Sequence, residues 1–503
     1  MSAMTEPSPG TNLAQLLADR AAERGWTGRP AFHAGEASYT HGELHDGVAR
    51  AAGVLQAAGV RAGDHVLLVL PDTIEFVWAF LGSARLGAVA ILVNPLLSED
   101  EHAYVLADAA PAVVVCEREL ASRFAGAPVL RSDELAAWLP DAEPAPAHPV
   151  TPATPLYAQY TSGTTGRPKA ALHGHADPAA FYQAMGVHAL RLEPDDVLVS
   201  VSKAFFAYGL GNSVIFPLFA GASAVLWRDR PAPAGLAELV RRHRPTVLFA
   251  VPTFYAKLLD EGDREPFGCL RAAVSAGEAL LAPLAERAEA WLGCPVLDGL
   301  GSTEVGQTFV SNTLERRLAG TIGMVLPPYE IEVRDEDGKP LADGSSGVLH
   351  VRGPSVLREY LNKPEATAAA FVEGWLRTGD LVRIDENGFV HHEGRVDDLE
   401  MVGGITMSPY EVEQLLATHE AVSEVAVAAV REANGASVLR AFVVPSAGHQ
   451  GSASVERELQ GLVRAHLAPY KVPRSVEFVP GLPRTPTGKL RRYLLREGAA
   501  PRS

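Results

Sequence analysis

Short apolar runs alternate with helical patterns along the first two thirds of the chain. Residues 65–70 form an apolar run typical of a buried strand, and apolar residues then recur at helical spacing from Ile74 to Arg85. A second apolar run spans residues 88–93. This order of strand, helix and strand is the repeating unit of a parallel sheet.

The same alternation recurs further along the chain. Further strand-like runs lie at residues 112–116, 246–250, 270–275 and 296–297, and further helical patterns at residues 254–259 and 281–292. Repeated alternation indicates an α/β architecture in which helices pack on the sheets. Residues 141–155 are rich in proline, and we expect an extended loop there, inside one large domain because similar patterns lie on both sides.

The pattern changes near residue 327. Short strand-like runs are separated there by hairpin signals, the pairs Asp337-Gly338, Asp343-Gly344 and Asn387-Gly388. After about residue 395 a smaller α+β pattern follows, with helices expected at 409–418 and 454–466 and strands at 422–430 and 439–444. The fold prediction is therefore α/β, with a large multi-sheet N-terminal domain and a small α+β C-terminal domain.

Composition excludes several classes of protein. The chain of 503 residues has 44 Lys and Arg against 60 Asp and Glu, and a net charge of -16 argues against a nucleic-acid-binding protein. Its three cysteines are far apart and form no C-x-x-C pair, so neither a disulfide framework nor a zinc site is expected. No signal peptide and no apolar stretch of the ~20 residues that a membrane helix needs is visible, which favours a cytoplasmic protein, monomeric or homodimeric.

The segment YTSGTTGRPK, residues 160–169, is the strongest chemical signal. Its glycines let the backbone approach a ligand, its hydroxyl groups can donate hydrogen bonds, and its lysine adds positive charge, as binding of an oxygen-rich anion requires. It is not the P-loop of nucleotide triphosphatases, because Arg167-Pro168 precedes the lysine instead of a glycine. A plain surface loop would explain the composition equally well.

This loop resembles the phosphate-binding signature of the adenylate-forming superfamily, which includes acyl- and aryl-CoA ligases, peptide-synthetase adenylation domains and luciferases. Four more segments resemble motifs of that family in the family's order: GSTE at 301–304, LRTGD at 376–380, GRVDDLEMVGG at 394–404 and PRTPTGKLRR at 483–492. The resemblance covers nearly the whole chain. It implies that a carboxylic acid attacks ATP to form an acyl-adenylate, with Mg²⁺ as cofactor, and that the acyl group then passes to a thiol.

The resemblance also implies roles for individual residues. The β- and γ-phosphates of ATP would be held by Thr161, Ser162, Gly163, Thr164, Thr165 and Lys169. Other nucleotide contacts would come from Gly277, Glu278, Asp298, Gly299, Asp380 and Arg395, with Asp380 accepting hydrogen bonds from the ribose hydroxyls. Glu304 would bind Mg²⁺, Thr303 would donate to the α-phosphate, and the catalytic Lys489 would bridge the carboxylate and the α-phosphate.

A hinge is implied as well. Residues 1–394 would form the ATP- and acid-binding domain, residues 398–503 the mobile domain with Lys489, and about 395–398 the hinge, at Asp397. After adenylation the small domain would rotate and present the strand around Gly403-Gly404 to the thiol step. Many relatives have a lysine at the position of Met401, so how this chain supports the thiol step is left open.

The segment KAFFAYGLGNSV, residues 203–214, resembles the benzoate-CoA ligase branch of the family. By that resemblance the acyl pocket would be lined by Phe206, Ala207, Tyr208, Gly209, Gly301 and Gln307. An aromatic wall beside a small residue suits a planar ring, although ordinary core packing would explain these residues without the resemblance. Gln307 stands where the branch has histidine, beside the small Gly306, which favours a hydroxy- or amino-substituted benzoate.

The acceptor and two alternatives from other classes remain to be separated. No carrier domain follows the lysine motif before Ser503, so we expect free coenzyme A, with a separate carrier protein as the alternative. Residues 273–277, AVSAG, nearly match the G-x-S-x-G motif of hydrolases, but Ala273 replaces the first glycine. A non-catalytic nucleotide-binding protein on the same fold should lack Lys489 or Glu304, and both are present.

Overall fold

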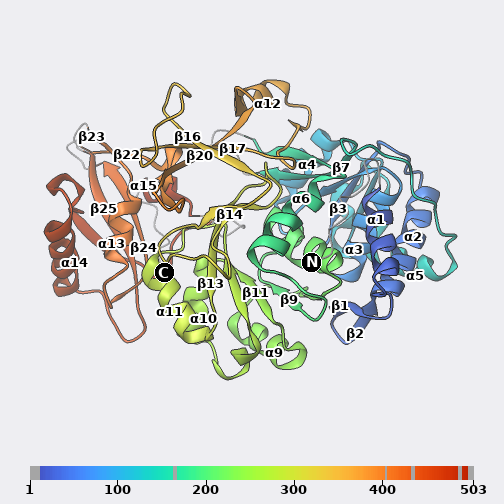
Figure 1. Ribbon diagram of the computed structural model, residues 1–503, viewed down its shortest axis with the longest axis horizontal. Helices are drawn as coiled ribbons and strands as arrows, with labels where there is room; N and C mark the ends of the chain where they lie inside the picture. Colours follow the sequence, from blue (N-terminus) through green and yellow to red (C-terminus); the bar gives the residue numbers. More distant parts are fainter. Residues whose placement is uncertain (1–11, 162–166, 403–404, 432–436, 485–489, 497–503) are drawn as a thin grey trace.

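A computed structural model describes residues 12–161, 167–402, 405–431, 437–484 and 490–496 (Figure 1). Seven strands build the first sheet, in the spatial order β18 (Glu359–Tyr360), β8 (Lys169–Gly174), β7 (Pro155–Thr161), β4 (Val89–Leu92), β3 (His65–Val69), β5 (Val113–Cys116) and β6 (Val129–Arg131). Strand β3 pairs in parallel with both β4 and β5. The strand–helix–strand prediction at residues 65–93 is confirmed, and helix α3 spans Ile74–Arg85 as expected.

The proline-rich loop lies inside this sheet's connectivity. Residues 142–154 form no helix or strand, and β7, which follows them, pairs in parallel with β4. The loop therefore joins two parts of one domain, as the flanking patterns predicted.

A second sheet has nine strands. In spatial order they are β15 (Met324–Val325), β14 (Thr308–Ser311), β13 (Val296–Gly301), β12 (Ala272–Ser275), β11 (Val247–Ala250), β9 (Val197–Ser200), β10 (Ser223–Leu226), β1 (Pro30–Ala34) and β2 (Ala37–Thr40). The strands from β13 to β1 are paired in parallel, whereas β14 and β15 continue the sheet antiparallel. One buried hydrophobic cluster, which includes Phe76, Tyr157 and Phe249, is shared between the two large sheets.

Helices cover these sheets. In the large domain they are α1 (Leu13–Glu23), α2 (His41–Ala57), α3, α4 (Glu99–Ala109), α5 (Ser132–Trp138), α6 (Asp177–Phe181), α7 (Ala207–Leu210), α8 (Phe216–Ala220), α9 (Pro233–His243), α10 (Pro252–Glu261), α11 (Ala282–Leu292) and α12 (Pro364–Ala370). Ser98 and Glu101 form a capping box at the start of α4. In the described ranges, no helix has both the length and the apolar character needed to cross a bilayer.

A third sheet of the large domain follows residue 327, where the hairpin signals lie. It contains β16 (Glu330–Arg334), β17 (Ser346–Arg352), β20 (Trp375–Ile384) and β19 (Phe371–Val372), and β21 (Val390–Arg395) pairs with β20. Asn387-Gly388 forms the turn between β20 and β21, with Gly388 at a φ of 83°. Residues of this sheet, such as Leu349 and Val382, belong to the hydrophobic cluster shared by the first two.

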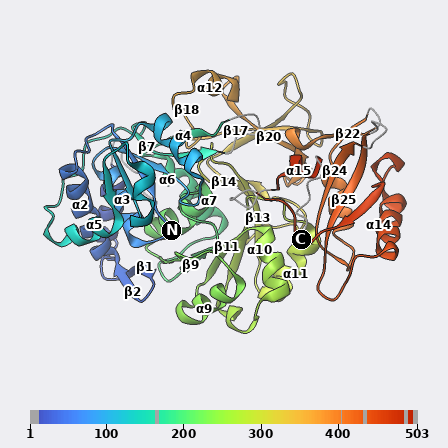
Figure 2. The same ribbon diagram turned by 180° about the vertical axis from the view of Figure 1, so that it is seen from behind.

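The C-terminal part has its own core. Strands β22 (Glu400–Val402) and β23 (Ile405–Met407) pair with each other, and β24 (Val422–Arg431), β25 (Ser437–Pro445) and β26 (Ser475–Phe478) form a separate sheet. Helices α13 (Tyr410–Leu416), α14 (Ala453–His466) and α15 (Arg492–Arg496) accompany them. Figures 1 and 2 place this part at one end of the long axis and α1, α2 and α5 at the other. The predicted architecture, a large multi-sheet domain and a small α+β domain, is confirmed.

Candidate active site

The phosphate side of the site is built where β7 and β8 pair. Thr161 at the end of β7 is the register partner of Lys169 at the start of β8, and the predicted residues Ser162, Gly163, Thr164 and Thr165 between them lie outside the described residues. The Lys169 ammonium lies 4.3 Å from the ring centroid of Tyr360. The hydroxyl of Tyr360 donates to Glu304 Oε1 over 2.9 Å. Tyr360 therefore joins the lysine to the predicted metal-binding carboxylate.

The turn that contains Thr303 and Glu304 is held from two sides. The backbone N–H of Leu357 donates to the carbonyl of Glu304 over 2.6 Å, and His173 Nε2 lies 2.7 Å from the carbonyl of Thr303. His173 is buried, and its Nδ1 lies 3.2 Å from Asp177 Oδ2. Neither Tyr360 nor His173 was predicted from the sequence. Both are single residues without a local pattern, and only the fold brings them to the motif.

A buried carboxylate lies on the third sheet. Asp380 on β20 is 4% exposed and is the register partner of Arg395 on β21, whose Nη1 donates to Asp380 Oδ1 over 3.0 Å. His392 Nε2 lies 3.3 Å from the same oxygen. Burial alone would raise the pKa of Asp380, but Arg395 and His392 outweigh it and hold the pKa below its ordinary value. Asp380 is thus an ionised acceptor at neutral pH.

These two clusters belong to one site. The charge of Asp380 above all, and also that of Glu304, raises the pKa of Arg395. Among the described residues, no group of three or more His, Cys, Asp or Glu side chains could hold a metal ion by itself. A magnesium ion at Glu304 would therefore need phosphate and water oxygens for its other ligands, which suits a hard cation that arrives with a triphosphate.

A third side of the site is the loop after β12. Gly277 has a φ of 89°, and Glu278 beside it accepts from Thr253 Oγ1 over 2.6 Å. Burial raises the pKa of Glu278, although Arg484 of the C-terminal domain donates to its Oε1 over 2.9 Å. Arg484 also donates to Glu424 of its own domain over 2.6 Å. The site is therefore in contact with both domains.

The predicted catalytic lysine cannot be placed. Lys489 lies in the segment 485–489, outside the described residues, but the flanking Arg484 and Leu490 form an antiparallel bridge. Arg484, the described residue before that segment, contacts Glu278 in the loop after β12.

The ends of β12 and β13 contain unpaired polar groups. Ser275 and Asp298 are register partners on these strands and are buried, but Ser275 Oγ and Asp298 Oδ1 make no hydrogen bond within the described structure. Burial raises the pKa of Asp298 well above its ordinary value. Ser275 is 0% exposed, so it cannot serve as the accessible nucleophile that a hydrolase requires. Next to Asp298, a side chain at Gly299 would begin 2.8 Å from the carbonyl of Val310.

The predicted acyl-pocket residues come together around α7. Phe206 immediately precedes this helix, Ala207 and Gly209 are buried in it, and the hydroxyl of Tyr208 donates to the carbonyl of Val274 over 3.2 Å. Burial, together with the nearby Asp298 carboxylate, raises the pKa of Tyr208 well above its ordinary value. Aromatic and small residues therefore lie together, as a pocket for a flat ring requires.

Gln307 lies behind these residues and is 2% exposed. Its Nε2 donates to the carbonyl of Tyr208 over 2.9 Å and to Asn212 Oδ1 over 3.3 Å. Its Oε1 accepts from the backbone N–H and the hydroxyl of Thr308. At Gly301 a side chain would begin 2.8 Å from the carbonyl of Gln307. Both ends of the Gln307 amide are therefore engaged by the protein, and its only pocket-side contacts among these bonds are with Tyr208 and Asn212.

Comparison with known proteins decides the family. A family model described as AMP-binding enzyme matches residues 18–361, and one described as AMP-binding enzyme C-terminal domain matches residues 411–489. The chain belongs to the AMP-binding enzyme family. The resemblance to adenylate-forming enzymes is thereby confirmed.

Relatives of this AMP-binding enzyme indicate its branch. The p-hydroxybenzoic acid–AMP ligase of Mycobacterium tuberculosis is 47% identical over 487 residues, 97% of this chain and 69% of that protein. The benzoate–CoA ligase of Thauera aromatica is 39% identical over 503 residues, 96% of this chain and 95% of that protein. The crystal structure of the anthranilate CoA ligase AuaEII in complex with anthranoyl-AMP covers 99% of both chains, at a TM-score of 0.92 and 30% identity.

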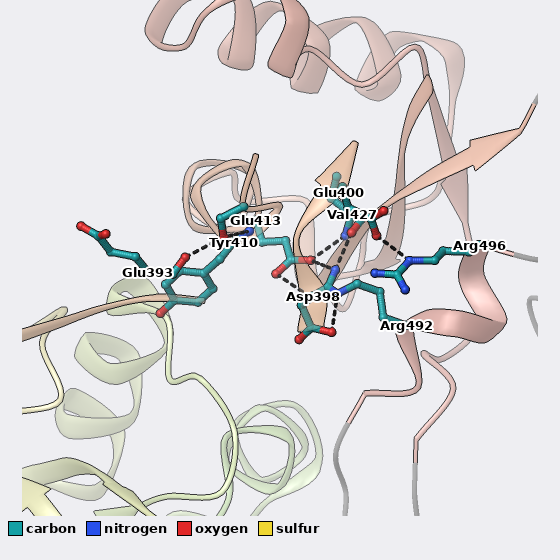
Figure 3. Close-up of polar contacts among 9 residues, drawn as sticks. Glu393, Asp398, Glu400, Tyr410, Glu413, Val427, Arg492 and Arg496 are labelled. Carbon is teal, nitrogen blue, oxygen red and sulfur yellow. Dashed lines mark hydrogen bonds and ion pairs between the residues drawn. The ribbon is translucent and has the colours of Figure 1, made fainter. Parts of the chain in front are cut away.

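The C-terminal domain of this AMP-binding enzyme contains a buried charge network (Figure 3). Arg492 is 9% exposed, its Nη1 donates to Glu413 Oε1 over 2.5 Å, and its Nε lies 3.7 Å from Asp398 Oδ1. Arg496 donates to the buried Glu400 over 2.9 Å. Asp398 ends the turn Val396–Asp398 that also contains the predicted hinge residue Asp397. The network therefore connects the helix after the lysine segment to the predicted hinge.

The predicted thiol-step residues Gly403 and Gly404 lie outside the described residues. Met401 on the preceding strand β22 is 63% exposed. Its side chain is therefore available to solvent next to that segment.

Proposed function

We propose that this chain uses ATP to activate a substituted benzoic acid to its acyl-adenylate, with release of pyrophosphate, and then transfers the acyl group to the thiol of coenzyme A. The observation that supports the first step is the convergence of two clusters on one site. Lys169 and Glu304, joined through Tyr360, can face a triphosphate, and Asp380 with Arg395 can face a ribose. Together the two clusters offer contacts for the triphosphate and the ribose of ATP.

In this proposal each group answers a need of the reaction. Attack of the carboxylate on the α-phosphate gathers negative charge, which oriented cations and donors stabilise. Lys169 and the segment before it hold the outer phosphates, Thr303 donates to the α-phosphate, and Lys489 bridges the two reacting groups. Mg²⁺ at Glu304 would supply positive charge to the phosphates. The ionised Asp380 accepts from the ribose hydroxyls and fixes the nucleotide.

The acid is proposed to be aromatic and substituted. The residues around α7 place Phe206 and Tyr208 beside Ala207 and Gly209, an arrangement that suits a planar ring. Relatives that are 47% and 39% identical are named for p-hydroxybenzoic acid and benzoate. We therefore place 4-hydroxybenzoate first among the candidates, followed by benzoate and 2-aminobenzoate. Gln307 would set the pocket shape by holding Tyr208 and Asn212.

A separate carrier protein is the second candidate acceptor. Two observations favour testing it: the relative that is 47% identical is named for its AMP product alone, and the exposed Met401 stands where many relatives have lysine. In either case the small domain is proposed to comprise residues 398–503 and to rotate at Asp397 relative to residues 1–394. That rotation would replace the lysine segment with the Gly403-Gly404 segment.

Acid-dependent ATP–pyrophosphate exchange tests the first step. The panel comprises benzoate, its hydroxy and amino derivatives, acetate, fatty acids and amino acids, with Lys489→Ala as the control in which exchange should be strongly reduced. Exchange with aryl acids alone is the expected result. Exchange only with acids of another class would refute the pocket assignment. Absence of exchange with every acid of the panel would refute the enzyme assignment. The purified adenylate is then offered to coenzyme A and to phosphopantetheinylated carrier proteins to identify the acceptor.

A further inference from the structure

The carboxylate of Asp108 lies behind the phosphate side of the site, near the end of helix α4. Its side chain is 9% exposed, and both of its oxygens are in use. Oδ2 accepts from the hydroxyl of Tyr160 over 2.9 Å, and Oδ1 pairs with Lys363 Nζ at 2.5 Å. Burial and the Asp108 carboxylate raise the pKa of Tyr160, so its hydroxyl stays protonated as the donor of that bond. Asp108 is not one of the residues that the family motifs identify.

The two partners of Asp108 belong to the two halves of the phosphate side. Tyr160 immediately precedes Thr161 on β7, at the entrance of the phosphate-binding segment. Lys363 follows Tyr360 by three residues, and Tyr360 in turn contacts both Lys169 and Glu304. A single buried carboxylate thus connects the strand that enters the segment to Lys363, which follows the Glu304-binding Tyr360 closely in the chain.

Helix α4 also holds the other end of that segment. The hydroxyl of Tyr104, one turn before Asp108, donates to the carbonyl of Pro168 over 2.9 Å, next to Lys169. The side-chain amide of Asn362 donates to the backbone carbonyl of Asp108 over 2.9 Å. The helix therefore contacts the residues on both flanks of segment 162–166 as well as the segment after Tyr360.

We propose that Asp108 is a positioning residue for the triphosphate: it sets the spacing between Lys169 and Glu304 without touching the nucleotide. A buried carboxylate with two donors is a strong restraint, because removing its charge leaves the Lys363 ammonium without its partner. The proposal rests on the assignment of Lys169 and Glu304 to the outer phosphates. It predicts that loss of Asp108 weakens ligands with β- and γ-phosphates and spares those without them.

Binding of two nucleotides measures this difference directly. Calorimetric titrations with Mg²⁺ compare α,β-methylene-ATP, which cannot be cleaved, with AMP, which lacks the outer phosphates. For Asp108→Asn, affinity for the ATP analogue should fall roughly 10-fold, the scale of a hydrogen bond to a charged group, while affinity for AMP stays unchanged. Lys363→Met should give the same pattern, and the double variant should lose no more than the larger single effect.

Asp46→Asn is the matched control, because Asp46 is an exposed carboxylate paired with Arg50 on α2. It should change neither affinity. Equal losses for both nucleotides in Asp108→Asn would show a general structural role and overturn the proposal, as would no loss for either. Nucleotide binding does not depend on the acid, so a wild-type chain that binds the analogue but activates no aryl acid would refute the proposed function alone.

Discussion

The predicted nucleotide-facing residues of the large domain and the contacts between the two domains are built differently. Asp380 and Glu304 are fixed by partners on neighbouring strands or turns, and the Asp380 carboxylate is almost fully buried. Between the domains, Arg484 contacts Glu278 and Ser423 donates to Asp260 over 3.1 Å, through side chains of which several are partly exposed. Partly exposed polar pairs contribute little free energy each. We therefore expect the first region to be rigid and the contacts between the domains to break and re-form at lower cost.

The largest loss of activity is expected from substitution of Lys489. Lys489→Ala should slow pyrophosphate exchange by about 10²–10³-fold, the scale of one preorganised donor at a developing charge. Transfer of the acyl group from supplied acyl-adenylate to the thiol should keep its wild-type rate, because the proposed rotation would withdraw the lysine face in that step. Separate rate measurements of the two half-reactions check this. An equal loss of rate in both half-reactions would mean that the lysine stays fixed in the site during both steps.

The next effect is at the buried carboxylate of the rigid region. Asp380→Asn should raise the KM for ATP by about 10- to 100-fold, because a charged acceptor for the ribose hydroxyls is lost. It should also lower the melting temperature at pH 7. The folded-state pKa of Asp380 is depressed, so its stabilisation is present above the ordinary value of about 3.9 and is lost as the pH falls through the folded-state pKa. The gap in melting temperature between wild type and variant should therefore close as the pH falls below about 4. A gap that widens in acid would contradict this assignment.

A smaller effect is expected at Gln307. Gln307→Leu removes four hydrogen bonds to Tyr208, Asn212 and Thr308 and should destabilise the domain by about 2 kcal/mol. The order of kcat/KM among benzoate, 4-hydroxybenzoate and 2-aminobenzoate should change, because Tyr208 is released. Gln307→His, which restores the residue of the benzoate branch, is the companion variant. An unchanged order in both variants would show that Gln307 has no part in ring selection.

The smallest effect concerns the contact between the domains. Arg484→Gln removes the charge that faces Glu278 but keeps a side-chain donor, and it should slow pyrophosphate exchange by roughly 3-fold, the scale of one weakened hydrogen bond. The thiol step from supplied adenylate should stay the same or become faster. Arg241→Gln, which removes an exposed ion pair far from the site, is the control. A loss of more than about 30-fold would mean that the interface is as rigid as the nucleotide side.

Sequence patterns predicted those parts of the molecule that depend on local order. Helix α3 has the predicted bounds because its apolar residues recur over twelve positions without interruption. The run at 296–297 was too short: β13 extends to Gly301, where Gly299 and Gly301 interrupt the apolar pattern but still pair with β14. No clear turn signal in the sequence marked the hairpin of β1 and β2. Hydrophobic periodicity predicts an element well where apolar side chains bury one of its faces, and poorly where glycines stand at those positions.

Some residues of the candidate site could likewise be predicted from the sequence, and others could not. Lys169, Glu304 and Asp380 lie in recognisable motifs, whereas Tyr360, His173 and His392 are isolated residues whose partners are distant in sequence or on a facing strand. His173 and Thr303 are 130 positions apart; His173 lies on β8 of the first sheet, whereas Thr303 follows β13 of the second. No sequence pattern marks a residue whose role comes from such a contact. The engagement of both ends of Gln307 was likewise invisible before the fold was known.

The pairing of Asp380 with Arg395 has a consequence for the geometry of the proposed domain rotation. Arg395 is the last residue of β21, and the turn Val396–Asp398 begins at the next position. The ribose end of the nucleotide would therefore sit almost on the pivot, where a rotation of any angle produces hardly any displacement. Residues at the far edge of the small domain would meanwhile move over long distances, because displacement in a rotation grows with distance from the axis. An adenylate anchored near this pivot could stay in place while the lysine segment is replaced by the segment of the thiol step.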